Sequence, residues 1–321
     1  MTARAEPVPA GTSPVWWLPA PAKLNLSLAI TGRRGDGYHL LETLFHALDL
    51  ADDLWLARHR QPGVVLTVRA ERPELQVPVG PDNLVVRALA GLAQAVGYRG
   101  GFRVHLHKRI PHGGGLGGGS SDAATALRLG AHSLGGACAG VPLRPLAARL
   151  GADVAFFLRG GSQWGRGIGD ELTPAEVPRR HFVLVAPPFG CPTVAVYKMY
   201  AALWNAHGTG GSVRGSAVPP NGDTFERMQF PNALLTAAEQ VRPELAALRQ
   251  RLGRLGLGEV AMTGSGSTLF LAFPTAEAAN AAHGRLAASE AAAGCTLYLT
   301  ASAAPSLPKP RLVGWPAEAH A

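Results

Sequence analysis

Apolar and polar residues alternate between residues 22 and 30, and the polar positions are Lys23, Asn25 and Ser27. A period of two is typical of a strand with one buried and one polar face. Residues 102–106 alternate in the same way and predict a second strand, which leads toward a run of glycines. The first strand is therefore expected to carry Lys23 and Asn25 side by side on its polar face.

The spacing of apolar residues elsewhere predicts further strands and helices. Strands are expected near 53–60, 64–69, 182–186 and 268–273. Helices are expected from Asn83 to about 95 and over 121–134, 143–150, 231–240, 243–255 and 275–289. Runs of each kind, rather than strict alternation, favour an α+β fold over a repeating parallel sheet.

The chain of 321 residues is long enough to bury two cores. We expect a flexible N-terminal tail over residues 1–15 and an N-terminal domain over 16–166. A C-terminal domain over 167–303 and a C-terminal tail over 304–321 complete the expected organisation.

Residues 111–121 read Pro-His-Gly-Gly-Gly-Leu-Gly-Gly-Gly-Ser-Ser. Residues without side chains let successive backbone N–H groups turn toward an anion, and a helix that begins at Ser120 or Ser121 would add its positive end. No Lys follows the last glycines, so this is not the Walker pattern. The two serine hydroxyls either bind phosphate or cap the helix, and the sequence leaves both open. We interpret the segment as an anion cradle, since flexible linkers rarely separate a strand and a helix so closely.

Composition adds little to this picture. A formal net charge of +8 fits an anionic ligand, but the arginines are scattered and form no basic run that would indicate a nucleic-acid surface. Three cysteines are too few for a disulfide framework or a metal knuckle. The sequence shows neither a signal-peptide pattern nor a membrane-length apolar run, which predicts a cytoplasmic protein.

Three segments, in order, resemble the motifs of the GHMP kinase superfamily: residues 21–26 (Pro-Ala-Lys-Leu-Asn-Leu), residues 111–121 and residues 263–266 (Thr-Gly-Ser-Gly). Four more are similar to those members whose acceptor alcohol carries a cytidine diphosphate group, in the non-mevalonate pathway of isoprenoid precursor biosynthesis: residues 35–39, 82–88, 151–154 and 192–193. The resemblance implies a two-domain GHMP kinase fold with the active site in the interdomain cleft. It also implies an ATP-dependent kinase, with Mg²⁺ bound to the nucleotide and no protein metal ligands assigned. The expected partner is a small molecule with a cytidine diphosphate group, without nucleic acid or membrane, and the protein is expected to be a monomer or a homodimer.

Lys23 and Asp153 are the predicted catalytic residues. Asp153 follows a glycine helix stop and precedes an apolar run, so its carboxylate is expected to be partly desolvated. The resemblance makes Lys23 its partner, and such a pair would place a base and a positive charge beside the reacting oxygen. A turn carboxylate and an exposed strand lysine are the structural alternatives.

The resemblance also implies which residues bind the nucleotide and the acceptor. The nucleotide-binding candidates are Asn83, Leu84, Lys108, Pro111, His112, Gly113, Gly114, Gly115, Leu116, Gly117, Gly118, Gly119, Ser120 and Ser121. The acceptor-binding candidates are Asn25, Tyr38, His39, Thr193 and Tyr197.

For a cytosine base, the two tyrosine rings would form a sandwich and His39 would meet the edge of the base. The nearest rival is a GHMP kinase for mevalonate, homoserine or a sugar, whose acceptors have no base to stack. A rival of another class is a nucleotide-binding or RNA-binding module without catalysis.

Overall fold

The computed structural model describes residues 13–206 and 229–320, and residues 1–12, 207–228 and 321 lie outside this description. The first of its two sheets has seven strands in the order β11-β1-β2-β4-β3, with β5 paired to β2 and β6 paired to β5. These strands are β1 Val15–Arg33, β2 His39–His59, β3 Gly63–Ala70, β4 Gly101–Lys108, β5 Ser162–Arg166, β6 Glu171–Pro174 and β11 Arg311–Val313. Neighbouring strands are antiparallel except β3 and β4, which are parallel.

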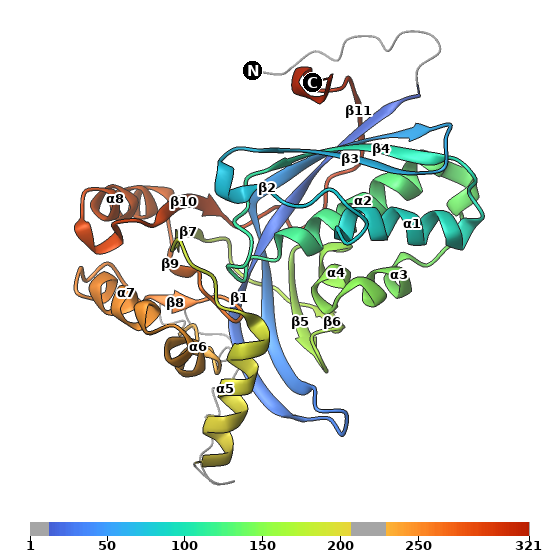
Figure 1. Cartoon of the computed structure of the whole chain (residues 1–321). Helices are drawn as coiled ribbons and strands as arrows, with labels where there is room; N and C mark the ends of the chain where they lie inside the picture. Colours follow the sequence, from blue (N-terminus) through green and yellow to red (C-terminus); the bar gives the residue numbers. More distant parts are fainter. Residues whose placement is uncertain (1–12, 207–228, 321) are drawn as a thin grey trace.

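Four helices pack on the first sheet (Figure 1): α1 Leu84–Val96, α2 Gly118–Leu134, α3 Leu143–Leu150 and α4 Ala152–Phe157. Asn83 begins α1 by accepting a hydrogen bond from the Val85 N–H, and Gly97 ends it in the left-handed conformation. Leucine, alanine and phenylalanine side chains of these helices and of the sheet form one continuous core. Short 3₁₀ turns lie at Pro73–Leu75, Gly135–Cys138 and Ala317–His320.

The second sheet has four strands in the order β10-β7-β9-β8. They are β7 His181–Ala186, β8 Ala261–Met262, β9 Leu269–Phe273 and β10 Thr296–Ala301. The helices of this half are α5 Thr193–Ala206, α6 Leu235–Val241, α7 Pro243–Gly253 and α8 Ala276–Ala287, with a 3₁₀ turn at Glu290–Ala292. They have their own apolar core.

The long β1–β2 hairpin joins the two halves and runs past α5 at its far end (Figure 1). A third apolar cluster lies between the two sheets; Leu24 and Leu26 of β1 meet Phe182 and Phe270 of the second sheet there. The polar face of β1 is buried as well, because Lys23, Asn25 and Ser27 are each no more than 5% exposed. The strand predicted as half-buried is thus covered on both faces, and its polar side chains line an interior site.

The predicted α+β fold is confirmed. Two segments differ from the expected domain bounds, because β6 extends the first sheet past residue 166 and β11 pairs with β1. Residues 311–313 therefore form part of the first sheet and not a free tail. Helix α2 begins at Gly118 rather than at the serines, since Gly117 already takes the left-handed turn that precedes it.

Candidate active site

The glycine-rich segment packs directly against the loop after β8. Gly115 has φ +79°, and a Cβ there would lie 2.4 Å from the Thr263 carbonyl oxygen. Gly117 has φ +71°, and a Cβ there would lie 2.9 Å from the Phe157 ring and 3.1 Å from Cγ of Lys23. Only glycine fits such a backbone without strain or displacement. The second and third sequence motifs therefore meet as two backbones in close contact.

The first turn of α2 follows this segment. The Ser121 N–H donates to the Gly117 carbonyl at 2.9 Å, so Ser121 belongs to the helix and does not cap it. The Ser121 side chain is buried, and its hydroxyl has no hydrogen-bond partner among the described residues. Ser120 is half-buried. A helix start that follows close-packed glycines suits an anionic phosphate group.

Lys23 lies against the same segment. Its backbone N–H donates to the Leu116 carbonyl at 3.0 Å, and its Nζ donates to Oδ1 of Asn25 at 2.5 Å. Its Nζ also lies 3.6 Å from Oδ2 of Asp153, an ion pair longer than a hydrogen bond. Burial lowers the pKa of the Lys23 ammonium, and the charge of Asp153 opposes that shift. The two residues that the sequence predicted as catalytic partners lie together.

Asp153 is in the first turn of the six-residue helix α4. Its side chain is 34% exposed, against 4% for Lys23, so the carboxylate faces open space while the ammonium is enclosed. An ionised carboxylate beside a fixed cation can accept a proton from an alcohol placed in that space.

Asn25 is held at both ends of its amide. Its Oδ1 accepts from Lys23, and its Nδ2 donates to Oγ1 of Thr43 at 2.7 Å. Its backbone N–H donates to Oγ1 of Thr263 at 3.0 Å. In this structure the Asn25 side chain orients Lys23. This is a structural role, whereas the resemblance implies a hydrogen bond to the acceptor. Thr43 was not predicted, because the pairing register of β1 and β2 is not visible in the sequence.

One cavity of about 250 Å³ joins these groups, and side chains from both halves of the molecule line it. Its lining includes Lys23, Asn25, Thr43, Phe45, Gly115, Gly117, Asp153, Ile168, Thr193, Tyr197, Gly264 and Ser265.

The second half contributes the start of α5. Oγ1 of Thr193 lies 3.0 Å from Oγ of Ser265 and forms a hydrogen bond that ties α5 to the third motif. Tyr197 follows one helical turn later, and burial raises the pKa of its hydroxyl to about 12, with a further contribution from the charge of Asp153. Tyr197 is therefore a neutral ring and hydroxyl at neutral pH.

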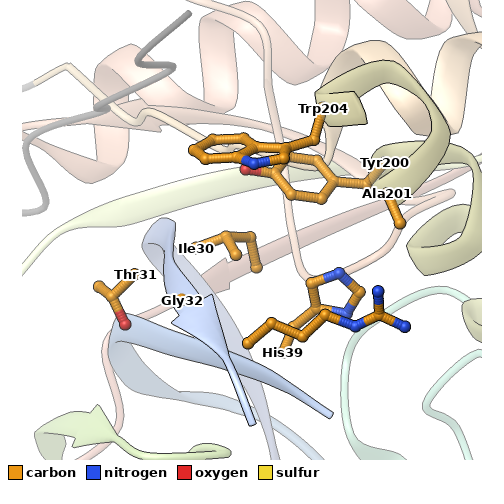
Figure 2. Close-up of a pocket in the computed structure, with 8 residues that line it drawn as sticks. Ile30, Thr31, Gly32, His39, Tyr200, Ala201 and Trp204 are labelled. Atoms are coloured by element: carbon orange, nitrogen blue, oxygen red, sulfur yellow. The ribbon is translucent and has the colours of Figure 1, made fainter. Parts of the chain in front are cut away.

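His39 lines a neighbouring cavity and contacts Tyr197, which lines the main one. Its ring centroid lies 5.3 Å from that of Tyr197 and 5.8 Å from that of Tyr200. The neighbouring cavity measures about 200 Å³, and Figure 2 shows Tyr200 and Trp204 projecting from α5 toward Ile30 and His39. Burial, and next the charge of Arg33, lower the pKa of His39, which favours the neutral imidazole.

Tyr38 does not join this aromatic group. Its side chain is 62% exposed, and the Arg34 guanidinium lies 5.8 Å from its ring centroid. The turn before β2 fixes this outward direction, because the Arg34 N–H donates to the Tyr38 carbonyl at 2.7 Å. The predicted sandwich of two tyrosine rings is not assembled in this structure, where His39 packs on Tyr197 instead.

Two of the nucleotide-binding candidates outside the glycine segment have structural partners. Asn83 caps α1, and its Nδ2 donates to the Pro78 carbonyl at 2.7 Å. Lys108 is almost fully buried, and its ammonium donates to two carboxyl groups beneath the glycine segment. Leu84 does lie beside the segment, since a Cβ at Gly119 would be 3.8 Å from its Cδ1.

The remaining positions of the segment differ in their exposure. Pro111 is half-buried, while His112, Gly113 and Gly119 are exposed. Gly114 and Leu116 are buried and anchor the segment from within. Among the described residues, no group of three or more histidines, cysteines or acidic residues could hold a metal ion.

Family models match both halves of the chain: GHMP kinases N terminal domain over residues 83–161 and GHMP kinases C terminal over residues 220–291. A curated 4-diphosphocytidyl-2-C-methyl-D-erythritol kinase from Xanthomonas axonopodis pv. citri is 39% identical over 269 residues, 84% of this chain and 85% of its own length. A curated protein of the same name from Bordetella bronchiseptica is 39% identical over 282 residues, which cover 87% of this chain and 89% of the relative.

Solved structures agree with these matches. A crystal structure of 4-(cytidine 5'-diphospho)-2C-methyl-D-erythritol kinase superposes with a TM-score of 0.70 at 35% identity and covers 90% of this chain and 100% of that chain. A homoserine kinase from Cytophaga hutchinsonii superposes with a TM-score of 0.65 at 19% identity, over 97% of this chain and 100% of that one, and supports the fold alone. In the part of the chain that the structure describes, no helix is both long and apolar enough to cross a membrane.

Proposed function

The chain belongs to the GHMP kinase family, and we propose that it transfers the γ-phosphoryl group of ATP to the 2-hydroxyl of 4-diphosphocytidyl-2-C-methyl-D-erythritol. Relatives of that name match it at 39% identity over most of both chains. The observation that carries the proposal is the meeting of Lys23 and Asp153 in one cavity with the glycine-rich segment. The products would be ADP and the 2-phosphate of the acceptor.

Asp153 is the proposed base at the acceptor hydroxyl. Its exposed carboxylate faces the cavity, so one of its oxygens can accept the hydroxyl proton while the hydroxyl oxygen bonds to phosphorus. Proton acceptors placed in this way contribute about 10²–10⁴-fold in rate.

Lys23 is the proposed electrostatic partner. Its ammonium is fixed by Asn25 and lies 3.6 Å from Asp153, a position from which it stabilises negative charge at the reacting oxygen. Because Lys23 is buried, water screens this charge less than it would at the surface.

The glycine-rich segment and the start of α2 are proposed to hold the nucleotide phosphates. The close packing of Gly115 and Gly117, which both line the cavity, supports that fit. Mg²⁺ would arrive with the nucleotide and neutralise phosphate charge, and we assign it no protein ligand.

The far end of the cavity is proposed to receive the cytosine. Tyr197 offers a ring face, and neutral His39 offers ring nitrogens for the edge of the base. Tyr38, exposed on the adjoining turn, remains the candidate for a second ring. Thr193 would assist at this end.

The test is an assay of the purified protein with Mg-ATP and a panel of alcohols. The panel contains the cytidine diphosphate acceptor, the same methylerythritol as its 4-phosphate without cytidine, mevalonate, homoserine and a sugar. We expect ADP release and a new phosphate ester, seen by ³¹P NMR, with the cytidine compound alone. Equal turnover of an acceptor without cytidine would assign the chain to another branch of the family. ATP binding without turnover on any alcohol would indicate a binding module.

A further inference from the structure

A cluster of three ionisable side chains lies beneath the glycine-rich segment, apart from the cavity. Nζ of Lys108 donates to Oδ2 of Asp122 at 2.8 Å and to Oδ2 of Asp52. The three residues are no more than 3% exposed. They come from β2, the end of β4 and α2, so they join three elements at one buried point.

This point lies directly under the phosphate-binding candidates. Oδ1 of Asp52 accepts the backbone N–H groups of Arg109 at 2.5 Å and Ile110 at 2.9 Å, which precede the glycines. A Cβ at Gly118 would lie 3.1 Å from Cγ2 of Ile110 and 3.3 Å from Nζ of Lys108. The cluster therefore fixes both the entry to the glycine segment and the place where it becomes α2.

The two carboxyl groups are not equivalent. Asp52 receives three hydrogen bonds, one from Lys108 and two from backbone N–H groups. Asp122 receives one, and its buried Oδ1 has no partner among the described residues. Two ionised carboxylates around one ammonium would leave a net negative charge without water, which is costly. The group with fewer donors is the one that gains more by keeping a proton.

The other charged side chains nearby do not change which of the two carboxyl groups keeps the proton. The elements that contact α2 are β1, β2, α1, α3 and α4, and β4 ends beside its first turn. Their charged side chains, with Arg109 just after β4, are Lys23, Arg33, Glu42, Asp49, Asp52, Asp53, Arg58, Arg87, Arg103, Lys108, Arg109, Arg144, Arg149 and Asp153. Lys23 pairs with Asp153, and Arg109 pairs with Asp53. Within the described chain, Lys108 is the ion-pair partner of Asp122.

We propose that Asp52 and Lys108 form a buried ion pair, that Asp122 beside them is a neutral carboxylic acid, and that this cluster positions the glycine-rich segment for phosphate. Burial raises the pKa of Asp122 to about 8 against the pull of the Lys108 charge, and the charge of Asp52 adds to the rise. Burial opposes the charge on Lys108, but the two carboxylates hold its pKa above the usual value.

The charge of Asp122 affects the proposed ATP site, an effect that rests on the proposed function. While Asp122 is neutral, the cluster carries no net charge beneath the phosphates. When Asp122 ionises at alkaline pH, a negative charge forms under the phosphate cradle and weakens phosphate binding. Asp122 and Asp52 are thus positioning residues, since neither faces the cavity.

The first test measures thermal unfolding of the full chain from pH 5 to pH 8 for the wild type and Asp122→Asn. The folded pKa of Asp122 lies above its unfolded value, so its contribution to stability is full below the unfolded pKa and is lost as pH rises toward 8. Asparagine cannot ionise. The melting temperature of the variant, relative to that of the wild type, should therefore increase by about 5 °C or more between pH 5 and pH 8.

Two further variants make this test sharper. Asp53→Asn, which alters the neighbouring Arg109 pair, should leave the wild-type pH slope unchanged. Asp52→Asn should be less stable than Asp122→Asn, because it removes the carboxylate that accepts more hydrogen bonds. The double variant should lose more stability than the two single variants together, because Lys108 then has no counter-charge in the cluster. Parallel pH curves for wild type and Asp122→Asn, or a greater loss in Asp122→Asn than in Asp52→Asn, would overturn the proposal.

The second test follows KM for Mg-ATP from pH 6.5 to pH 9. The wild-type KM should rise about threefold above pH 8, while the KM of Asp122→Asn should stay flat over the same range. Coincident KM profiles would contradict the electrostatic link to the phosphates. If no preparation turns ATP over, the proposed function fails, and the unfolding curves still decide the state of Asp122.

Discussion

The two ends of the cavity are built differently. At the phosphate end, backbone groups fix the geometry: Lys23 N–H bonds to the Leu116 carbonyl, and Gly115 lies against the Thr263 carbonyl. At the base end, side chains from a turn and from α5 meet through ring contacts, and Tyr38 stays outside them. Backbone contacts hold the phosphate end, whereas the base end includes one ring, that of Tyr38, on an exposed turn.

This difference matches the chemistry that each end is proposed to perform. Phosphoryl transfer depends on groups held in place before reaction, because reorganisation during the step would raise the barrier. Recognition of a base needs ring faces and hydrogen bonds, which side chains on a turn can supply after binding. Substitutions at the phosphate end should therefore lower kcat or raise KM for ATP, and those at the base end should raise KM for the acceptor.

The largest effect is expected for Asp153→Ala, at the reacting end. Loss of the proton acceptor should lower kcat by a factor on the order of 10² or more, while ATP still binds. Steady-state kinetics and calorimetric titration with ATP measure the two quantities separately. Glu171, exposed on β6, offers a control as Glu171→Ala with normal turnover. A kcat near that of the wild type for Asp153→Ala would remove Asp153 from the mechanism.

Gly115→Ala tests whether the phosphate end is rigid. Its Cβ would overlap the Thr263 carbonyl oxygen, so the glycine segment must move away from the third motif. We expect kcat/KM for ATP to fall about 10²-fold, since displacements of about 1 Å have that effect.

Gly113→Ala is the matched control, because its φ of +71° is similar but a Cβ there meets nothing within 4 Å. Both substitutions carry backbone strain, and only the first carries the steric overlap. Equal losses in the two variants would show that the contact with Thr263 does not position the segment.

The difference between backbone-fixed and side-chain-built regions also explains which features could be predicted from the sequence. Motifs with backbone constraints were recognisable, since glycines that need special conformations appear directly in the sequence. The pairing of Lys23 with Asp153 followed from the resemblance, and the structure brings the two within ion-pair distance. The burial of the polar face of β1 could not be predicted, because alternation does not say whether a second sheet covers the polar side.

Three residues at the site illustrate what the sequence lacks. Thr43 orients Asn25 from the neighbouring strand, and strand register depends on long-range pairing. Lys108 was expected to bind the nucleotide. The sequence does not show its buried ion pair, because the partner Asp52 is 56 residues away in the chain. Side-chain direction at Tyr38 depends on the turn geometry, which motif spacing does not specify.

Tyr38→Ala tests whether the exposed Tyr38 ring takes part in binding at the base end. If the exposed ring stacks on the base in the complex, KM for the cytidine acceptor should rise about tenfold, within the range of about 1–3 kcal/mol for one stacked ring. KM for ATP and kcat should change little. Tyr38→Phe keeps the ring and should behave as the wild type. An unchanged acceptor KM in Tyr38→Ala would leave His39 and Tyr197 as the aromatic residues of this end.

The smallest effect is expected where the two ends meet, at Thr193. Its hydroxyl bonds to Ser265 at 3.0 Å and ties α5, which carries Tyr197, to the loop that holds the glycine segment. Thr193→Val keeps the shape and removes that hydrogen bond, worth about 1 kcal/mol, so kcat/KM for the acceptor should fall about fivefold. Thr193→Ser should restore the wild-type value, and Val194→Ala, at an exposed neighbour, should have no effect. A loss confined to ATP binding would mean that this contact supports the phosphate end alone, and the two ends would then be independent.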